Sequence, residues 1–166
     1  MRRCVVMAGL LGVLPGQAMA ASGQHASAAG AASSTVIVPI TLTHSAGGVL
    51  NFGTMTVGPG GGNVIVTTTG TGVAVGAVTL ISSGAVSADQ FTVTGDANRN
   101  FSVTTGAGYV TAGSSSMLFA TSPSSGQATL SATGAGTFSV GGSLSVGSGI
   151  APGVYHGTYT VTVTYD

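Results

Sequence analysis

The sequence predicts an all-β fold, an antiparallel sandwich built from about ten short strands. Three observations lead to this prediction. Short blocks rich in Val, Ile, Phe, Tyr and Thr alternate apolar and polar residues, which is the two-residue period of a β-strand. Gly, Pro, Ser and Asn separate these blocks in the manner of turns. Gly, Thr and Ser also interrupt every apolar run, so no window favours a long helix.

The most regular block is the terminal segment 154–166, V-Y-H-G-T-Y-T-V-T-V-T-Y-D. From residue 158 onward four apolar side chains alternate with threonines, and they are Tyr159, Val161, Val163 and Tyr165. This strand is predicted to have one apolar and one hydroxyl face. No hairpin partner follows it in the sequence, so we expect its second edge to be unpaired or covered by another molecule.

The remaining strands are predicted from the same pattern, at residues 35–43, 50–57, 63–69, 73–82, 91–94, 101–104, 117–120, 127–132, 137–140 and 144–146. Pro39 lacks the N–H donor that a central strand needs, so we expect the first block to break there. The glycine run 58–62 predicts a turn, and residues 95–100 predict a polar hairpin loop. Gly141 and Gly142 predict a bend.

Alternation within these blocks also selects a core. One side chain in two faces inward, and the apolar members of that set form the predicted core. They are Leu50, Phe52, Val64, Val66, Val78, Leu80, Phe91, Val93, Leu130, Phe138, Tyr159, Val161 and Val163.

The composition indicates an extracellular or structural polymer protein. Its 166 residues suit one domain, and only 4% of them are charged, against about a quarter in ordinary domains. Ser, Thr and Gly take the place of Lys and Glu. Disorder is the alternative, but the discrete alternating blocks argue against it.

Residues 1–20 resemble a secretory signal peptide. Two arginines precede an apolar run at 4–14, and A-M-A at 18–20 is a small-x-small cleavage site. The alternative is an N-terminal membrane anchor. Removal at residue 20 leaves no cysteine, because Cys4 leaves with the peptide, and only one basic side chain, Arg99. Nucleic-acid binding is excluded on this count, since phosphate contacts need Lys and Arg.

The mature chain divides into two predicted parts. Residues 21–38 form a flexible N-terminal extension rich in Ala, Ser and Gly. Residues 39–166 form the β-sandwich domain.

The sequence contains no convincing catalytic or metal-binding pattern. His25, His44 and His156 are isolated and lack the spacing of metal ligands. Asp89 and Asp96 flank predicted turns, where Asp favours local backbone bonds. The glycine run 58–62 lacks the Lys of a phosphate-binding loop. We therefore expect no catalytic, cofactor-binding or metal-binding residue, and we expect that the protein is not an enzyme.

Four motifs carry a resemblance to a known family. In order they are L-N-F-G at 50–53, F-x-V-x-G at 91–95, F-S-V-G-G-S-L at 138–144 and G-x-Y-x-G-T-Y-T-V-T-V-x-Y at 153–165. Together they resemble the secreted bacterial DUF4402 family, over residues 35–166. That family is similar to spore-coat-U-type and archaic chaperone–usher pilins, which share the first and last motifs. The chain lacks the paired cysteines of many spore-coat-U-type pilins.

The resemblance implies an immunoglobulin-like sandwich that lacks its last strand. It implies a structural subunit of a bacterial surface fibre (pilus or fimbria), in which the N-terminal extension of one subunit fills the groove of the next by donor-strand exchange. The partners would be copies of itself or related pilins, a periplasmic chaperone and an outer-membrane usher. The protein would be secreted to the periplasm and then displayed on the cell surface.

The resemblance also assigns candidate residues. The donor segment would plug the groove with Val36 and Val38, which share one face of an extended strand, while Ile37 lies on the other face. The acceptor-groove strand would carry Tyr159, Val161, Val163 and Tyr165.

Two other classes of function remain open. A secreted adhesin or carbohydrate-binding module would use amide side chains, which are Gln24, Asn51, Asn63, Gln90, Asn98, Asn100 and Gln127, but the chain has no Trp. The threonine ladder at 158–164 is similar to hydroxyl arrays of ice-binding proteins, although it occupies one strand only.

Overall fold

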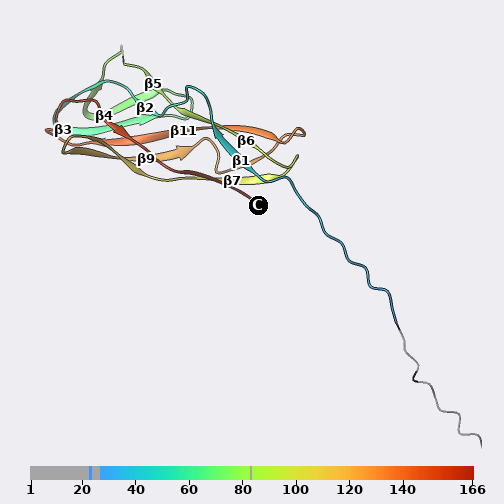
Figure 1. Ribbon diagram of the computed structural model, residues 1–166. Helices are drawn as coiled ribbons and strands as arrows, with labels where there is room; N and C mark the ends of the chain where they lie inside the picture. Colours follow the sequence, from blue (N-terminus) through green and yellow to red (C-terminus); the bar gives the residue numbers. More distant parts are fainter. Residues whose placement is uncertain (1–22, 24–26, 83) are drawn as a thin grey trace, which may run out of the picture. The chain divides into compact units, whose positions relative to one another are not determined.

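The structure, a computed structural model, describes residues 23, 27–82 and 84–166 of the chain. The predicted signal peptide at 1–20, Gln24 and His25 lie outside the described residues. The chain divides into two compact units, Met1–Thr35 and Val36–Asp166. In the first unit the described residues are exposed and carry no helix or strand. The second unit holds every strand in the described part of the chain (Figure 1).

The second unit is an antiparallel β-sandwich, as the sequence predicts, and every strand pair in it is antiparallel. The described residues contain no helix, and so none that could cross a membrane. The larger sheet has eight strands, which are β1 (Thr41–His44), β3 (Met55–Val66), β4 (Gly72–Leu80), β6 (Asp89–Thr94), β8 (Gly108–Ala112), β9 (Ser115–Pro123), β11 (Ala135–Val146) and β12 (His156–Gly157). A three-stranded sheet contains β10 (Gln127–Thr129), β7 (Asn100–Thr105) and β13 (Val161–Tyr165). A small third sheet pairs β2 (Asn51–Phe52) with β5 (Val86–Ser87).

Strand β11 organises the larger sheet. Along one edge it pairs first with β6 and then with β3, and along the other edge it pairs with β9 (Figure 1). The predicted bend at Gly141 and Gly142 is wrong, because β11 continues through these residues and changes its neighbour there. A Cβ at Gly141 would collide with the carbonyl of Val66. The glycine therefore permits a close approach of two strands, and it makes no turn.

The glycine run 58–62 also differs from its prediction, because it lies inside β3 and not in a turn. The pairing of β3 with β4 shifts register between Val57 and Gly62, which marks a β-bulge. Gly61 and Gly76, on the two strands, have positive φ angles of 62° and 86°. Glycine adopts these angles without strain, so the run bends a long strand and does not end it.

The predicted hairpin between residues 91–94 and 101–104 is likewise wrong. Strand β6 pairs with β1 and β11 in the larger sheet, whereas β7 pairs with β10 and β13 in the three-stranded sheet. The loop between them crosses from one sheet to the other. Its backbone is tied to the turn before β11, since Gly95 donates to the carbonyl of Gly134 at 2.8 Å and Asn98 donates to that of Ser131 at 3.1 Å.

The terminal segment is split between the two sheets. Strand β12 pairs with β8 in the larger sheet, and β13 pairs with β7 in the smaller one, so residues 158–160 form a crossing. The predicted strand from residue 158 therefore begins only at Val161. Its two faces are confirmed: Val161, Val163 and Tyr165 are half-buried, and the threonines between them are exposed.

The core consists of two clusters. The Phe52 cluster contains Phe52, Val64, Val66, Val78, Met117, Phe119, Leu144 and Val146. The Phe91 cluster contains Phe91, Val93, Phe101, Val103, Leu130, Phe138 and Val140. Among the predicted core residues, the ones that are only half-buried are Leu50, Leu80, Tyr159, Val161 and Val163. The prediction omitted Phe101, Val103, Met117, Phe119, Val140, Leu144 and Val146.

Candidate functional site

Two strands with free edges meet on one side of the sandwich. Strand β13 pairs with β7 along one edge, and β1 pairs with β6 along one edge. In the described part of the chain no strand pairs with the second edge of either. The two strands approach each other, so we call residues 40–44 and 159–165 together the β1–β13 seam.

The N–H and C=O groups of successive residues in β13 point alternately to its two edges. The carbonyl of Thr160 accepts from Gly106, and Asp166 donates to the carbonyl of Asn100, so both residues bond toward β7. Because this direction repeats every second residue in an antiparallel ladder, the peptide groups of Val161, Val163 and Tyr165 face the free edge. Polar groups that could pair with one more strand therefore line the seam.

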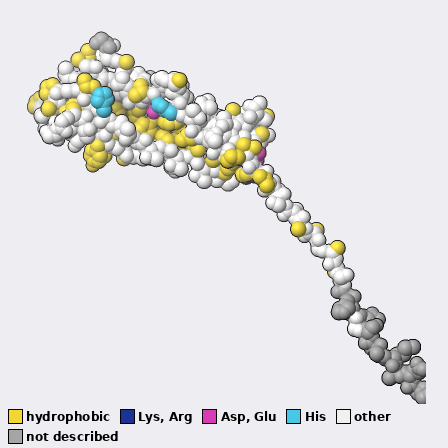
Figure 2. Space-filling view, viewed as in Figure 1, with side chains coloured by type: hydrophobic (Ala, Val, Ile, Leu, Met, Phe, Trp, Pro, Cys, Tyr) yellow, Lys and Arg dark blue, Asp and Glu magenta, His cyan; other side chains and the backbone are white. Residues whose placement is uncertain are grey.

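The side chains of the seam are apolar and incompletely covered. Ile40, Leu42, Val161, Val163 and Tyr165 pack on the Phe91 cluster and are half-buried. Figure 2 shows hydrophobic side chains gathered in a band on this face of the molecule, beside a histidine that touches an acidic side chain. The seam thus offers both unpaired backbone groups and partly exposed apolar surface.

One end of the seam is closed by a polar cluster around Asp89. This carboxylate is 5% exposed and accepts from the Nε2 atom of His44 at 2.6 Å, from the hydroxyl of Tyr159 at 2.7 Å and from the amide of Gln90 at 2.8 Å. Burial, together with the bond to Asp89 and its charge, raises the pKa of Tyr159 far above its ordinary value. Tyr159 therefore stays protonated and joins the crossing before β13 to β6.

The other end of the seam is closed by Tyr165. Its hydroxyl accepts from the amide of Asp96 at 2.6 Å and donates to the carbonyl of Val38 at 2.8 Å. The guanidinium carbon of Arg99 lies 5.5 Å from the centre of the tyrosine ring, and its Nε atom is 3.3 Å from the Asp96 carboxylate. This hydroxyl thus joins β13 to the segment that leads into β1.

The structure brings the predicted acceptor residues onto one face of the seam. Val36 and Val38 are 93% and 55% exposed, and the carbonyl of Val38 lies at the Tyr165 end. The predicted strand at 35–43 is only partly confirmed: residues 35–40 on both sides of Pro39 carry no strand, and β1 begins at Thr41. The roles of donor and acceptor remain predictions.

The polar cluster was not predicted from the sequence. Asp89 was expected beside a turn and His44 was expected to be isolated, whereas the two side chains form a part-buried pair. A signal was present in D-Q-F-T-V-T, where Asp89 falls in phase with the inward-facing Phe91 and Val93. His156 is exposed in β12. Within the described residues no three His, Cys, Asp or Glu side chains gather at a possible metal site.

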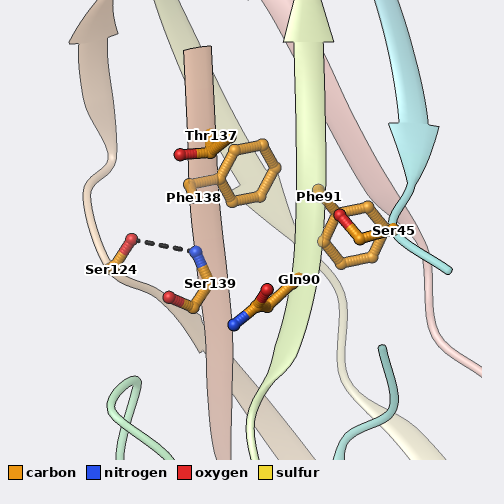
Figure 3. A pocket seen from close by; sticks show the side chains of 7 residues that line it. All are labelled: Ser45, Gln90, Phe91, Ser124, Thr137, Phe138 and Ser139. Carbon is orange, nitrogen blue, oxygen red and sulfur yellow. Dashed lines mark hydrogen bonds between the residues drawn. The ribbon is translucent and has the colours of Figure 1, made fainter. Parts of the chain in front are cut away.

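Two shallow depressions lie elsewhere on the sandwich. The first, of about 240 Å³, is lined by Ser45, Gln90, Phe91, Ser124, Thr137, Phe138 and Ser139 (Figure 3). Its two phenylalanine rings stack at 5.4 Å but are buried, so they offer no open ring face for a sugar. The Ser124 hydroxyl already accepts a hydrogen bond from the backbone amide of Ser139 at 3.1 Å. The second, of about 310 Å³, lies over Gly141 and Gly142.

Comparison with protein-family models matches residues 40–165 to DUF4402, a domain of unknown function. The chain belongs to the DUF4402 family. The matched residues run from the start of the β1–β13 seam to Tyr165 at its end, so the family model includes the whole of the site. Searches of curated proteins and of solved structures found no match.

Proposed function

We propose that this DUF4402 protein is a structural subunit of a bacterial surface fibre that polymerises by donor-strand exchange, like the spore-coat-U-type and archaic chaperone–usher pilins it resembles. The segment around Val36 and Val38 of one copy pairs with the free edge of β13 in the next copy. The observation that carries this proposal is the seam itself, where two free strand edges border half-buried apolar side chains.

Strand addition at this edge satisfies two physical needs at once. The peptide groups of Val161, Val163 and Tyr165 gain backbone hydrogen bonds, which provide affinity without sequence preference. The inward-facing donor side chains cover the Phe91 cluster, and each fully buried Val contributes about 1.5–3 kcal/mol. Val36 and Val38 are exposed in the isolated subunit and are available for this burial.

The direction of the donor decides whether the assembly is open or closed. Strands β1 and β13 run in opposite directions, because His44 and Tyr159 meet at one end of the seam while Val38 and Tyr165 meet at the other. A donor antiparallel to β13 brings its own domain to the His44 end of the acceptor, so each subunit donates at one end and receives at the other. Such a head-to-tail contact generates filaments. The opposite direction joins two Tyr165 ends and closes a dimer, so the fibre requires the antiparallel donor.

The proposal implies protection before assembly. An unpaired edge beside half-buried apolar side chains is a template for uncontrolled pairing. A periplasmic chaperone that occupies the seam, and an outer-membrane usher that exchanges it for the donor, would meet this need. The function requires no catalytic residue, metal or cofactor. The hydrogen bonds that Asp89 accepts from His44 and Tyr159 link β6 to β1 and to the crossing before β13, which is a structural role.

The test uses the chain from residue 21 onward, observed by electron microscopy and by light scattering after gel filtration. Val36→Asp with Val38→Asp should give folded monomers and no fibres, because each buried carboxylate costs several kcal/mol. Deletion of residues 21–38 should have the same effect. The matched control is Thr35→Asp with Ile37→Asp, which changes the opposite face and should leave fibres. Normal polymerisation of the deleted chain would show that this segment is not the donor.

A further inference from the structure

We propose that Tyr165 is a positioning residue that stops the donor segment from filling the seam of its own subunit. Its hydroxyl holds the carbonyl of Val38 at 2.8 Å and so keeps this segment available to a second copy. The inference rests on the proposed function. It concerns whether the donor segment enters the seam of its own subunit, which we call self-filling, or the seam of a second copy, which we call exchange.

Self-filling is a real competitor, because the donor segment and the seam are neighbours in one chain. Only Pro39 and Ile40 separate Val38 from the first residue of β1. A reversal at these two residues would lay the donor segment along the free edge of β1, inside its own seam. Because the two segments belong to one chain, the effective concentration of the donor at its own seam is high, which favours self-filling over exchange between copies. A subunit that forms fibres therefore needs something that disfavours the reversal.

The Tyr165 hydroxyl is held from two sides. The amide of Asp96 donates to it at 2.6 Å, and the same Asp96 bonds Arg99, whose guanidinium lies over the tyrosine ring. Next to it, Asp166 donates to the carbonyl of Asn100 at 3.2 Å and anchors the end of the strand. The hydroxyl is thus a fixed point, and the Val38 carbonyl that it binds is fixed with it.

The backbone at Pro39 and Ile40 also disfavours the reversal. A two-residue hairpin turn needs positive φ at one or both of its central positions, which favours Asn and Gly. Pro39 has a fixed negative φ, and β-branched Ile40 avoids positive φ. Neither residue is among the described residues with positive φ. Proline also holds the preceding residue, Val38, in an extended conformation. The tether and the local sequence therefore both keep the segment from turning back.

Tyr155 provides a matched comparison outside the seam. Its hydroxyl donates to the carbonyl of Ala151 at 2.7 Å, and its side chain packs against the Phe52 cluster. Loss of this hydroxyl removes a hydrogen bond to a backbone carbonyl without releasing Val38 or changing the seam. The two tyrosines thus separate the effect of the tether from a general loss of stability.

The experiment traps the donor in whichever seam it occupies. Two cysteine pairs are introduced separately into the chain from residue 21 onward, which contains no other cysteine. The exchange pair, Val36→Cys with Val163→Cys, has both side chains on the inward face of the exchanged complex and links chains into ladders. The self-filling pair, Ile37→Cys with Val161→Cys, links within one chain, because a two-residue turn at Pro39 and Ile40 places Ile37 opposite the inward-facing Leu42. A non-reducing gel separates internally linked monomers from ladders, and each pair is compared alone, with Tyr165→Phe and with Tyr155→Phe. Circular dichroism checks that each variant is folded.

We expect ladders from the exchange pair. Tyr165→Phe should raise the ratio of internally linked monomer, measured with the self-filling pair, to ladder, measured with the exchange pair, about two- to tenfold, which is the effect of one neutral hydrogen bond. Tyr155→Phe should leave the ratio unchanged. A second variant, Pro39→Asn with Ile40→Gly, supplies a turn that favours reversal and should raise the ratio with Tyr165 intact.

The outcomes separate the two proposals. An unchanged ratio in Tyr165→Phe, or an equal rise in Tyr155→Phe, overturns the role of Tyr165, while ladders from the exchange pair uphold exchange. If Tyr165→Phe does not fold, an unchanged ratio in the turn variant overturns the inference alone. The absence of both ladders and internal links in every variant overturns the proposed function, and the inference falls with it.

Discussion

Strands β4 and β13 each have a free edge in the described part of the chain, yet they differ in glycine content and in the regularity of their ladders. Strand β4 contains Gly72 and Gly76, and its ladder with β3 is broken by the bulge at Gly62. Strand β13, V-T-V-T-Y, contains no glycine, proline or charge and keeps an unbroken register with β7. Bulges are a known protection of sheet edges against pairing. The comparison indicates that the bulge protects one edge against pairing, whereas the other edge has no such protection.

The largest difference is expected from a charge placed on each strand. Val163→Asp puts a carboxylate against the Phe91 cluster and should lower the free energy of unfolding by several kcal/mol. Val75→Asp, on a β4 position that is 51% exposed, should change it by less than about 0.5 kcal/mol. Urea unfolding of the chain without residues 21–38 measures both values. Equal losses would remove the distinction between the two strands.

A smaller effect is expected from the anchor before β13. Tyr159→Phe removes a hydrogen bond to the Asp89 carboxylate and should cost about 1.5–3 kcal/mol at neutral pH.

The same variant should also change the response to alkali. The pKa of Tyr159 is raised in the folded state, and an unfolded tyrosine ionises near pH 10. The unfolded chain therefore releases this proton first, so the stability that Tyr159 provides is complete below pH 10 and declines above it. The expected slope is about 1.4 kcal/mol per pH unit. Urea unfolding between pH 9 and 11 should show this slope reduced in Tyr159→Phe, and an identical slope in both proteins would contradict the assignment.

The smallest effect is expected at the β4 bulge. Gly76 has a φ of 86°, and an added Cβ would lie 2.9 Å from the carbonyl oxygen of Gly61, so Gly76→Ala should cost about 1–2 kcal/mol. The matched control, Gly60→Ala, changes a nearby glycine of β3 that has no positive φ and whose Cβ would meet only ordinary contacts. It should cost less, and urea unfolding compares the two. Equal costs would show that backbone conformation does not control the bulge.

The sequence predicted what depends on local pattern. The alternation of apolar and polar residues predicted the all-β class, the two faces of β13 and the inward positions of Phe52, Val64 and Phe91. Such predictions succeed because successive side chains of any strand point to opposite faces, whatever its neighbours are.

The sequence did not predict which strand lies beside which. Glycine run 58–62 has the composition of a turn, and only the partner strand β4 makes it a bulge. Residues 95–100 have the composition of a hairpin loop, but β6 and β7 find other partners. The bonds from Asp89 to His44 and Tyr159 span 45 and 70 residues of chain. Contacts this distant depend on topology, which short-range patterns do not contain.

The position of β1 has a mechanical consequence for a fibre. In the proposed fibre, this four-residue strand borders the seam that would receive a donor, and it follows two residues after Val38 of the segment that would be donated. Tension between subunits would pass from a received strand to β1 and directly into the donated segment. The force would follow one edge of the sandwich, with the strands loaded along their length, and would leave the Phe52 cluster outside its path. A pulled fibre would then yield first at the seam, while the rest of each subunit kept its fold.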